Sequence, residues 1–165
     1  MGYVFGNTSK RRLSTCHNDL ILIAEEALKY SYLDFGITQG ARTVEQQKEY
    51  YKKGTSKINP DSYASLEDLA DKANHIVIEG HSKYNVSRAF DIYAWIPGRK
   101  DLMWNSNYLN VIGGTIMSTA ERLYEEGKIS HQLRWGNDWN QNRILVTEDK
   151  KESLVDAPHF ELLNY

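Results

Sequence analysis

The chain has 165 residues, which suits one domain of ordinary size with a hydrophobic core of its own. Its 20 basic and 22 acidic residues nearly balance, which argues against a general polyanion-binding protein, so we expect no nucleic-acid partner. The single cysteine excludes an intramolecular disulfide framework and a cysteine-rich zinc site, which leaves His, Asp and Glu as the side chains for a metal.

Helices dominate the first third of the chain. Apolar residues at helical spacing predict a first helix over residues 13–30, with Ser14 or Thr15 as its cap. A short strand is expected over residues 35–39. Thr43 is expected to cap the next helix, which a glycine ends about three turns later.

Residues 55–79 are the least regular segment. A turn and a short helix over residues 65–73 are expected there, and we interpret the segment as an insertion or flap over a cleft. The remaining elements are a strand over 89–95, a long helix over 106–127, and strands over 132–135 and 158–163. This order predicts one α+β domain over residues 1–165, with a small antiparallel sheet flanked by helices.

Neither end of the chain nor its interior predicts membrane insertion. No apolar run reaches the length of a membrane-spanning helix, and the N-terminus lacks the apolar segment of a signal peptide. We therefore expect synthesis in the cytoplasm, so any action outside it needs release by another factor.

Five histidines are available as metal ligands, and they differ in their surroundings. His17, in the first predicted helix, and His131, after the long helix, are expected to be polar surface residues. His75 lies in the irregular segment and receives no role. His81 and His159 each flank a predicted strand and lie near a carboxylate, which makes them the stronger candidates.

Asp91 interrupts the strand over residues 89–95. A buried carboxylate is costly to desolvate without a partner. Side chains alternate along a strand, so Asp91 shares its face with Tyr93 and Trp95, while the apolar residues point to the core. Asp91 is therefore expected to face a cleft, either in a structural ion pair or in a metal site.

The acid–histidine pair Asp156 and His159 precedes the last strand through a turn, which can aim both side chains into one cleft. Two imidazoles and one carboxylate are a ligand set for a catalytic zinc that leaves a position open. We expect His81, Asp91 and His159 to form that set. Asp156 is then the spare carboxylate for acid–base chemistry, and Arg42 is a candidate cation for a developing oxyanion.

Four segments in order resemble one family. Residues 82–91 resemble the signature Ser-x-His-x-x-Gly-x-Ala-x-Asp of zinc peptidases that cleave D-alanyl-D-alanine or L-alanyl-D-glutamate bonds in peptidoglycan. Residues 39–43 resemble the segment that carries the family's arginine. Residues 134–139 resemble its Trp/Phe-Gly-x-Asp-Trp segment, and residues 156–161 resemble its terminal acid-x-x-His motif.

The opening motif departs from the family pattern. Without gaps, the family's ligand histidine falls on Tyr84 and its glycine on Ser87, while His81 lies three positions upstream. Three interpretations follow. His81 supplies the imidazole from a rearranged loop, Tyr84 ligates as a phenolate, or the site has lost its metal. We favour His81, because zinc binds imidazole more readily than a phenol that must first lose its proton.

The resemblance implies a fold of the hedgehog/D-Ala-D-Ala peptidase type and a monomeric zinc peptidase, most similar to bacteriophage endolysins that cleave L-Ala-D-Glu bonds. The implied partner is the peptidoglycan stem peptide, reached in the periplasm or cell wall after release from the host cytoplasm. The alternatives are a D-Ala-D-Ala carboxypeptidase and a metal-free peptidoglycan-binding module. Residues expected to position the stem peptide are Ser82, Tyr93, Trp95 and Trp135.

Overall fold

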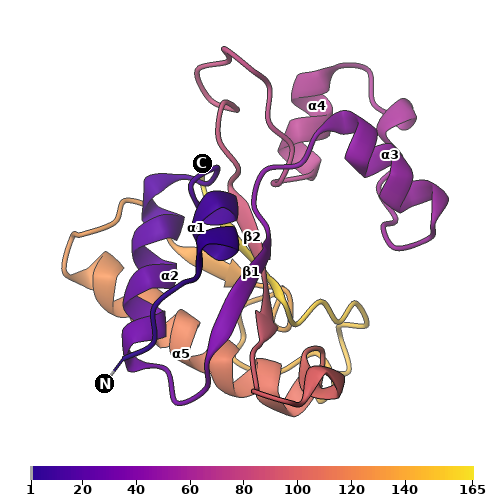
Figure 1. The fold of residues 1–165 in the computed structure, drawn as a ribbon. Coiled ribbons are helices and arrows are strands. Elements are labelled where there is room, and N and C mark those ends of the chain that lie inside the picture. Colours follow the sequence, from indigo (N-terminus) through magenta and orange to yellow (C-terminus); the bar gives the residue numbers. More distant parts are fainter. Residues whose placement is uncertain (1) are drawn as a thin grey trace.

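The fold is built on an antiparallel sheet whose strands are far apart in the sequence (Figure 1). A computed structural model describes residues 2–165. The order across the sheet is β1-β2-β4-β3, so the last strand of the chain lies in the interior of the sheet. The strands are β1 (Phe35–Gln39), β2 (Ala89–Ala94), β3 (Leu133–Trp135) and β4 (His159–Leu162).

Helices α2 and α5 cover one face of this sheet (Figure 1). Their apolar stripes pack on the inward-facing side chains of β2 and β4, such as Phe90, Ile92 and Phe160, which are fully buried. Burial of this apolar surface is the main stabilising contribution to the fold. The helices of this body are α1 (Asn7–Leu13), α2 (Asn18–Tyr30), the short η2 (Lys100–Leu102) and α5 (Ser106–Glu125).

A separate lobe, residues 44–86, stands away from the sheet and its helices (Figure 1). It contains α3 (Val44–Lys52), η1 (Pro60–Ser62) and α4 (Leu66–Lys72), followed by a loop that leads back to β2. Leu69, Ile76 and Tyr84 form a small core of their own inside it. The lobe is tied to the body by the backbone bridge between Arg42 and Ile76.

The α+β class with a small antiparallel sheet is confirmed. Most predicted elements begin within a residue or two of their observed starts; Thr43 caps α3 through a capping box, and Ser65 caps α4. The first helix differs. Residues 7–13 form α1, which was not expected, and α2 begins only at Asn18, with His17 rather than Ser14 or Thr15 as its cap.

None of the helices within residues 2–165 combines the length and the apolar character needed to cross a membrane.

Candidate active site

Three side chains meet on the face of the sheet opposite α2 and α5. His75 Nε2 lies 3.2 Å from Asp91 Oδ1, His159 Nδ1 lies 3.0 Å from the same oxygen, and the two nitrogens are 3.2 Å apart. Asp91 and His159 face each other as cross-strand partners of β2 and β4. His75 arrives from the loop after α4, so the cluster joins the lobe to the sheet.

The outer nitrogen of each imidazole is held by a hydrogen-bond acceptor. His75 Nδ1 donates to the Gly40 carbonyl at 2.7 Å, since a carbonyl can only accept. His159 Nε2 donates to Glu161 at 2.9 Å. In the neutral rings, the lone pairs of the inner nitrogens therefore point toward each other and toward Asp91. Such a set could hold a cation, and outer partners of this kind orient metal-bound histidines.

The charges around His159 keep its neighbouring carboxylates ionised. Burial alone would raise the pKa of Asp91, but the rings of His75 and His159 lower that pKa well below its usual range. Burial likewise acts against ionisation of Glu161, yet His159, Asn74 and Arg134 lower its pKa to about 2. Between these two anions the pKa of His159 rises to about 10, although its burial opposes this.

Arg42 brings a positive charge to the same cluster. Its guanidinium lies 3.7 Å from Asp91 Oδ2 and donates to Gln47 Oε1 at 2.8 Å. The Tyr50 ring lies beneath it, 4.7 Å from the guanidinium carbon. The Arg42 backbone N–H donates to the His75 carbonyl at 2.7 Å, so the arginine and the histidine are positioned together.

Asp156 lies in the turn before β4 and is half-buried. Burial raises the pKa of its carboxyl; the charge of Asp91 adds to this, while His159, His75 and Arg42 oppose it. Gly136 makes the turn possible, because a Cβ at this position would lie 2.2 Å from the Asp156 carbonyl oxygen.

The structure corrects the expectation that His81 stands beside Asp91 and His159, because His75 takes that place. His81 Nδ1 accepts from the backbone N–H groups of Lys83 and Tyr84, and its ring stacks on Tyr84. Tyr84 does not join the cluster either.

Tyr84 instead belongs to the lobe. It is 4% exposed, it packs in the small core of the lobe, and its hydroxyl donates to Asp71. The contacts of Tyr84 therefore do not favour the phenolate alternative for a metal ligand.

The residues expected to contact substrate differ in their exposure: one is buried in the core, and the others are at least partly accessible. Trp135 is a correction: it is 6% exposed, its indole stacks on Phe160, and its N–H donates to the Ala157 carbonyl, so it belongs to the core. Tyr93 lies on the Asp91 side of β2 and is half-buried, and Trp95 follows the end of the strand and is exposed. Ser82 is exposed in the loop of the lobe.

Sequence reasoning missed His75 and Glu161. His75 lies 16 residues before Asp91, a much longer spacing than the family motif has. The loop between them, residues 76–86, includes His81 and Tyr84 and lengthens the motif. The signal that could have identified His75 is Arg88-Ala89-Phe90-Asp91, which matches the end of the motif and leaves its histidine to be sought upstream across an insertion.

The family of phage L-alanyl-D-glutamate peptidases has a model that matches residues 1–163. The chain belongs to this family. It is 29% identical over 164 residues to the L-alanyl-D-glutamate peptidase of Escherichia phage T5, an alignment that covers 99% of this chain and 100% of the phage protein. The peptidoglycan peptidase that the motifs imply is thereby confirmed.

The fold agrees with that membership. The crystal structure of the Serratia marcescens L-Ala D-Glu endopeptidase ChiX is similar to this peptidase with a TM-score of 0.61, over 97% of this chain and 90% of the Serratia chain. Sequence identity between the two is 21%, so this likeness bears on the fold alone.

Proposed function

We propose that this peptidase hydrolyses the L-alanyl-D-glutamate bond of peptidoglycan stem peptides with one zinc ion held by His75, Asp91 and His159. The observation that carries the proposal is the convergence of two imidazole nitrogens on one carboxylate oxygen, with both outer nitrogens already engaged. Two imidazoles and a carboxylate are a common protein ligand set for catalytic zinc.

The donor set fits zinc better than a harder cation. Calcium and magnesium prefer oxygen ligands, whereas two of the three inward-facing atoms are imidazole nitrogens. Glu161 supports the set from outside, since its ionised carboxylate accepts from His159 Nε2 and so keeps the Nδ1 lone pair aimed inward. When bound, zinc supplies Lewis acidity and lowers the pKa of water.

The other residues have separate roles in the proposed reaction. Asp156 takes the proton of the attacking water and delivers it to the leaving amine; a carboxyl whose pKa is raised toward the working pH is suited to both transfers. Arg42 places its positive charge where the scissile carbonyl oxygen gains negative charge. Tyr93, on the Asp91 side of β2, and Trp95, after the end of the strand, offer aromatic surface for the substrate.

The place of action follows from the substrate. The stem peptide lies in the cell wall, so we propose that the enzyme acts there as a phage endolysin does, after release from the host cytoplasm. A monomer remains our expectation. Digestion of purified muropeptides separates the L-Ala-D-Glu bond from the D-Ala-D-Ala alternative, since the two cleavages leave products of different mass.

Metal content tests the ligand assignment. The purified enzyme should hold zinc in this cluster, and chelation should abolish lysis of permeabilised cells until zinc is returned. His75→Ala should lose that zinc and its activity, because it removes one of two imidazoles. His81→Ala is the matched control and should retain both the zinc and the activity. Full activity of exhaustively metal-free enzyme would leave a zinc mechanism untenable.

A further inference from the structure

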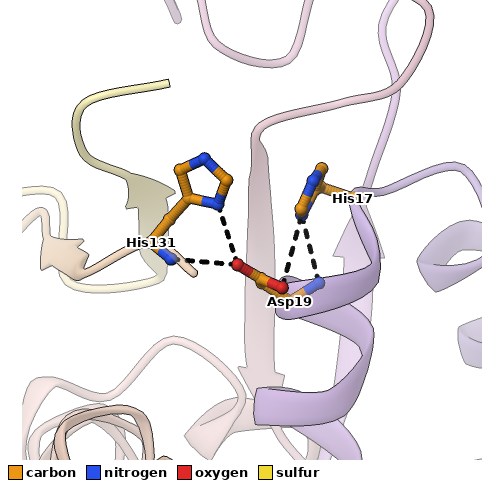
Figure 2. Close-up of side chains that lie close together, drawn as sticks. All are labelled: His17, Asp19 and His131. Atoms are coloured by element: carbon orange, nitrogen blue, oxygen red, sulfur yellow. Dashed lines mark hydrogen bonds and ion pairs between the residues drawn. The ribbon is translucent and has the colours of Figure 1, made fainter. Parts of the chain in front are cut away.

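We propose a second zinc site, formed by His17, Asp19 and His131, which shares no residue with the His75 cluster (Figure 2). His17 caps α2, Asp19 lies in the first turn of that helix, and His131 lies in the loop between α5 and β3. One donor atom from each lies within 4.8 Å of the others. The site does not depend on the proposed peptidase mechanism.

His17 offers an unprotonated nitrogen to this site. Its Nδ1 accepts the backbone N–H of Asp19 at 3.1 Å, so a zinc ion would replace that N–H as the partner of the nitrogen's lone pair. The same nitrogen lies 3.9 Å from Asp19 Oδ1. Burial lowers the pKa of His17; Asp19 opposes this, and the neighbouring His131 adds to it.

Asp19 is a carboxylate held in place with one oxygen to spare. Its Oδ2 accepts from the backbone N–H groups of Ser130 and His131 at 2.9 and 3.0 Å and from His131 Nδ1 at 2.8 Å. Within residues 2–165, Oδ1 accepts no hydrogen bond and lies on the His17 side (Figure 2). The backbone bonds fix this carboxylate before any metal arrives, which reduces the entropic cost of binding.

His131 completes the set by exchanging a proton for the ion. His131 Nδ1 donates to Asp19 Oδ2 at 2.8 Å; to ligate zinc through Nδ1, the ring would carry its proton on Nε2 instead, a change of tautomer that solvent can mediate. Zinc ligands at about 2.0–2.2 Å lie about 3–3.5 Å apart, so the side chains must move by about 1 Å.

The surroundings permit entry and then shelter the ion. The side chains of His17 and His131 are 23% and 22% exposed, so a hydrated ion can reach their nitrogens. The ring of Tyr165 lies 5.2 Å from each imidazole and packs against both. A zinc ion here ties the start of α2 to the segment that leads into β3, so its expected effect is on stability rather than on turnover.

Zinc binding by matched glutamine variants tests the site. Equilibrium dialysis of metal-stripped protein against low-micromolar free zinc should give one zinc fewer per chain for His17→Gln and for His131→Gln than for the parent. His81→Gln, outside both clusters, should match the parent. His131→Gln leaves the backbone bonds to Asp19 in place, so it is the variant least able to disturb the fold.

A second measurement separates this site from the catalytic cluster. In a His75→Gln background, zinc at a hundredfold excess over its dissociation constant should raise Tm by roughly 5–10 °C, and adding His17→Gln should abolish the rise. Loss of the rise supports the site even if the catalytic proposal fails. The second zinc site is overturned if His17→Gln and His131→Gln bind as much zinc as the parent and the Tm rise persists in the double variant.

Discussion

Asp156 is the residue on which the proposed proton transfers depend. Asp156→Asn keeps the size of the side chain but cannot accept a proton from water, so turnover should fall by on the order of a hundredfold or more. Zinc content should stay at the parent level, because Asp156 lies outside the His75, Asp91 and His159 set. Metal analysis and muropeptide kinetics measure the two effects.

The control for this variant is Asp101→Asn, at an exposed carboxylate on η2. Asp101→Asn should change neither turnover nor zinc content. If Asp156→Asn instead releases the metal while activity survives in excess zinc, Asp156 is a ligand and the roles assigned here must be exchanged.

Glu161 acts through His159 rather than on substrate. Glu161→Gln removes the charge that holds the proton on His159 Nε2, so the inner lone pair is less well oriented and less basic. Zinc affinity should fall roughly 10–100-fold, which competition with a chromophoric chelator measures. Glu126→Gln, at an exposed carboxylate paired with Arg122, should leave affinity unchanged. Unaltered affinity in Glu161→Gln would contradict this supporting role.

Within α5, two adjacent glycines have different environments. A Cβ on Gly113 would lie 2.2 Å from the Trp135 ring, whereas a Cβ on Gly114 would meet nothing within 4 Å. The absence of a side chain therefore lets this helix pack closely on the sheet at Gly113. This contact keeps Trp135 flat against Phe160, directly beside the start of β4.

Alanine at each glycine should have opposite effects on the free energy of unfolding. Gly113→Ala should destabilise the fold by about 1–3 kcal/mol through overpacking against Trp135. Gly114→Ala should stabilise it by up to about 1 kcal/mol, because alanine is the better helix former. Thermal unfolding of the metal-free variants measures both. Equal effects at the two positions would show that the Trp135 contact does not limit the packing of α5.

At the scale of the whole molecule, the proposed catalytic cluster of His75, Asp91 and His159 spans two cores. Asp91 and His159 belong to the sheet, whereas His75 is attached to the lobe of residues 44–86, whose small core includes Leu69 and Tyr84. Local opening of a weakly packed region requires less free energy than global unfolding. Opening of the lobe would carry His75 away and disassemble the cluster.

Leu69→Ala tests this division. It should cost about 2–5 kcal/mol, lost mainly from the local stability of the lobe. Amide hydrogen exchange should quicken in residues 44–86 while β2 and β4 stay protected, and zinc affinity should fall. Leu20→Ala, in the main core, should instead speed exchange across the body. Uniform acceleration in Leu69→Ala would mean that lobe and body unfold as one unit.

The sequence by itself determined most elements and the enzyme family. Alternation around Asp91 indicated a polar face of β2, and the capping residue Thr43 marked the start of α3. These are local signals, since strand alternation and capping depend on residues a few positions apart. Helix α1 was missed because Gly6 provides no side-chain cap and so leaves no signal of that kind.

The tertiary structure alone decided which histidine joins Asp91 and His159. His81 is nearer to Asp91 in sequence, but the loop over residues 76–86 folds back on the lobe, where Tyr84 buries its ring and His81 accepts backbone N–H groups. Distance along the chain does not give distance in space once a loop has a core of its own. His75 reaches the sheet because the Arg42–His75 backbone hydrogen bond docks the end of the lobe beside β2.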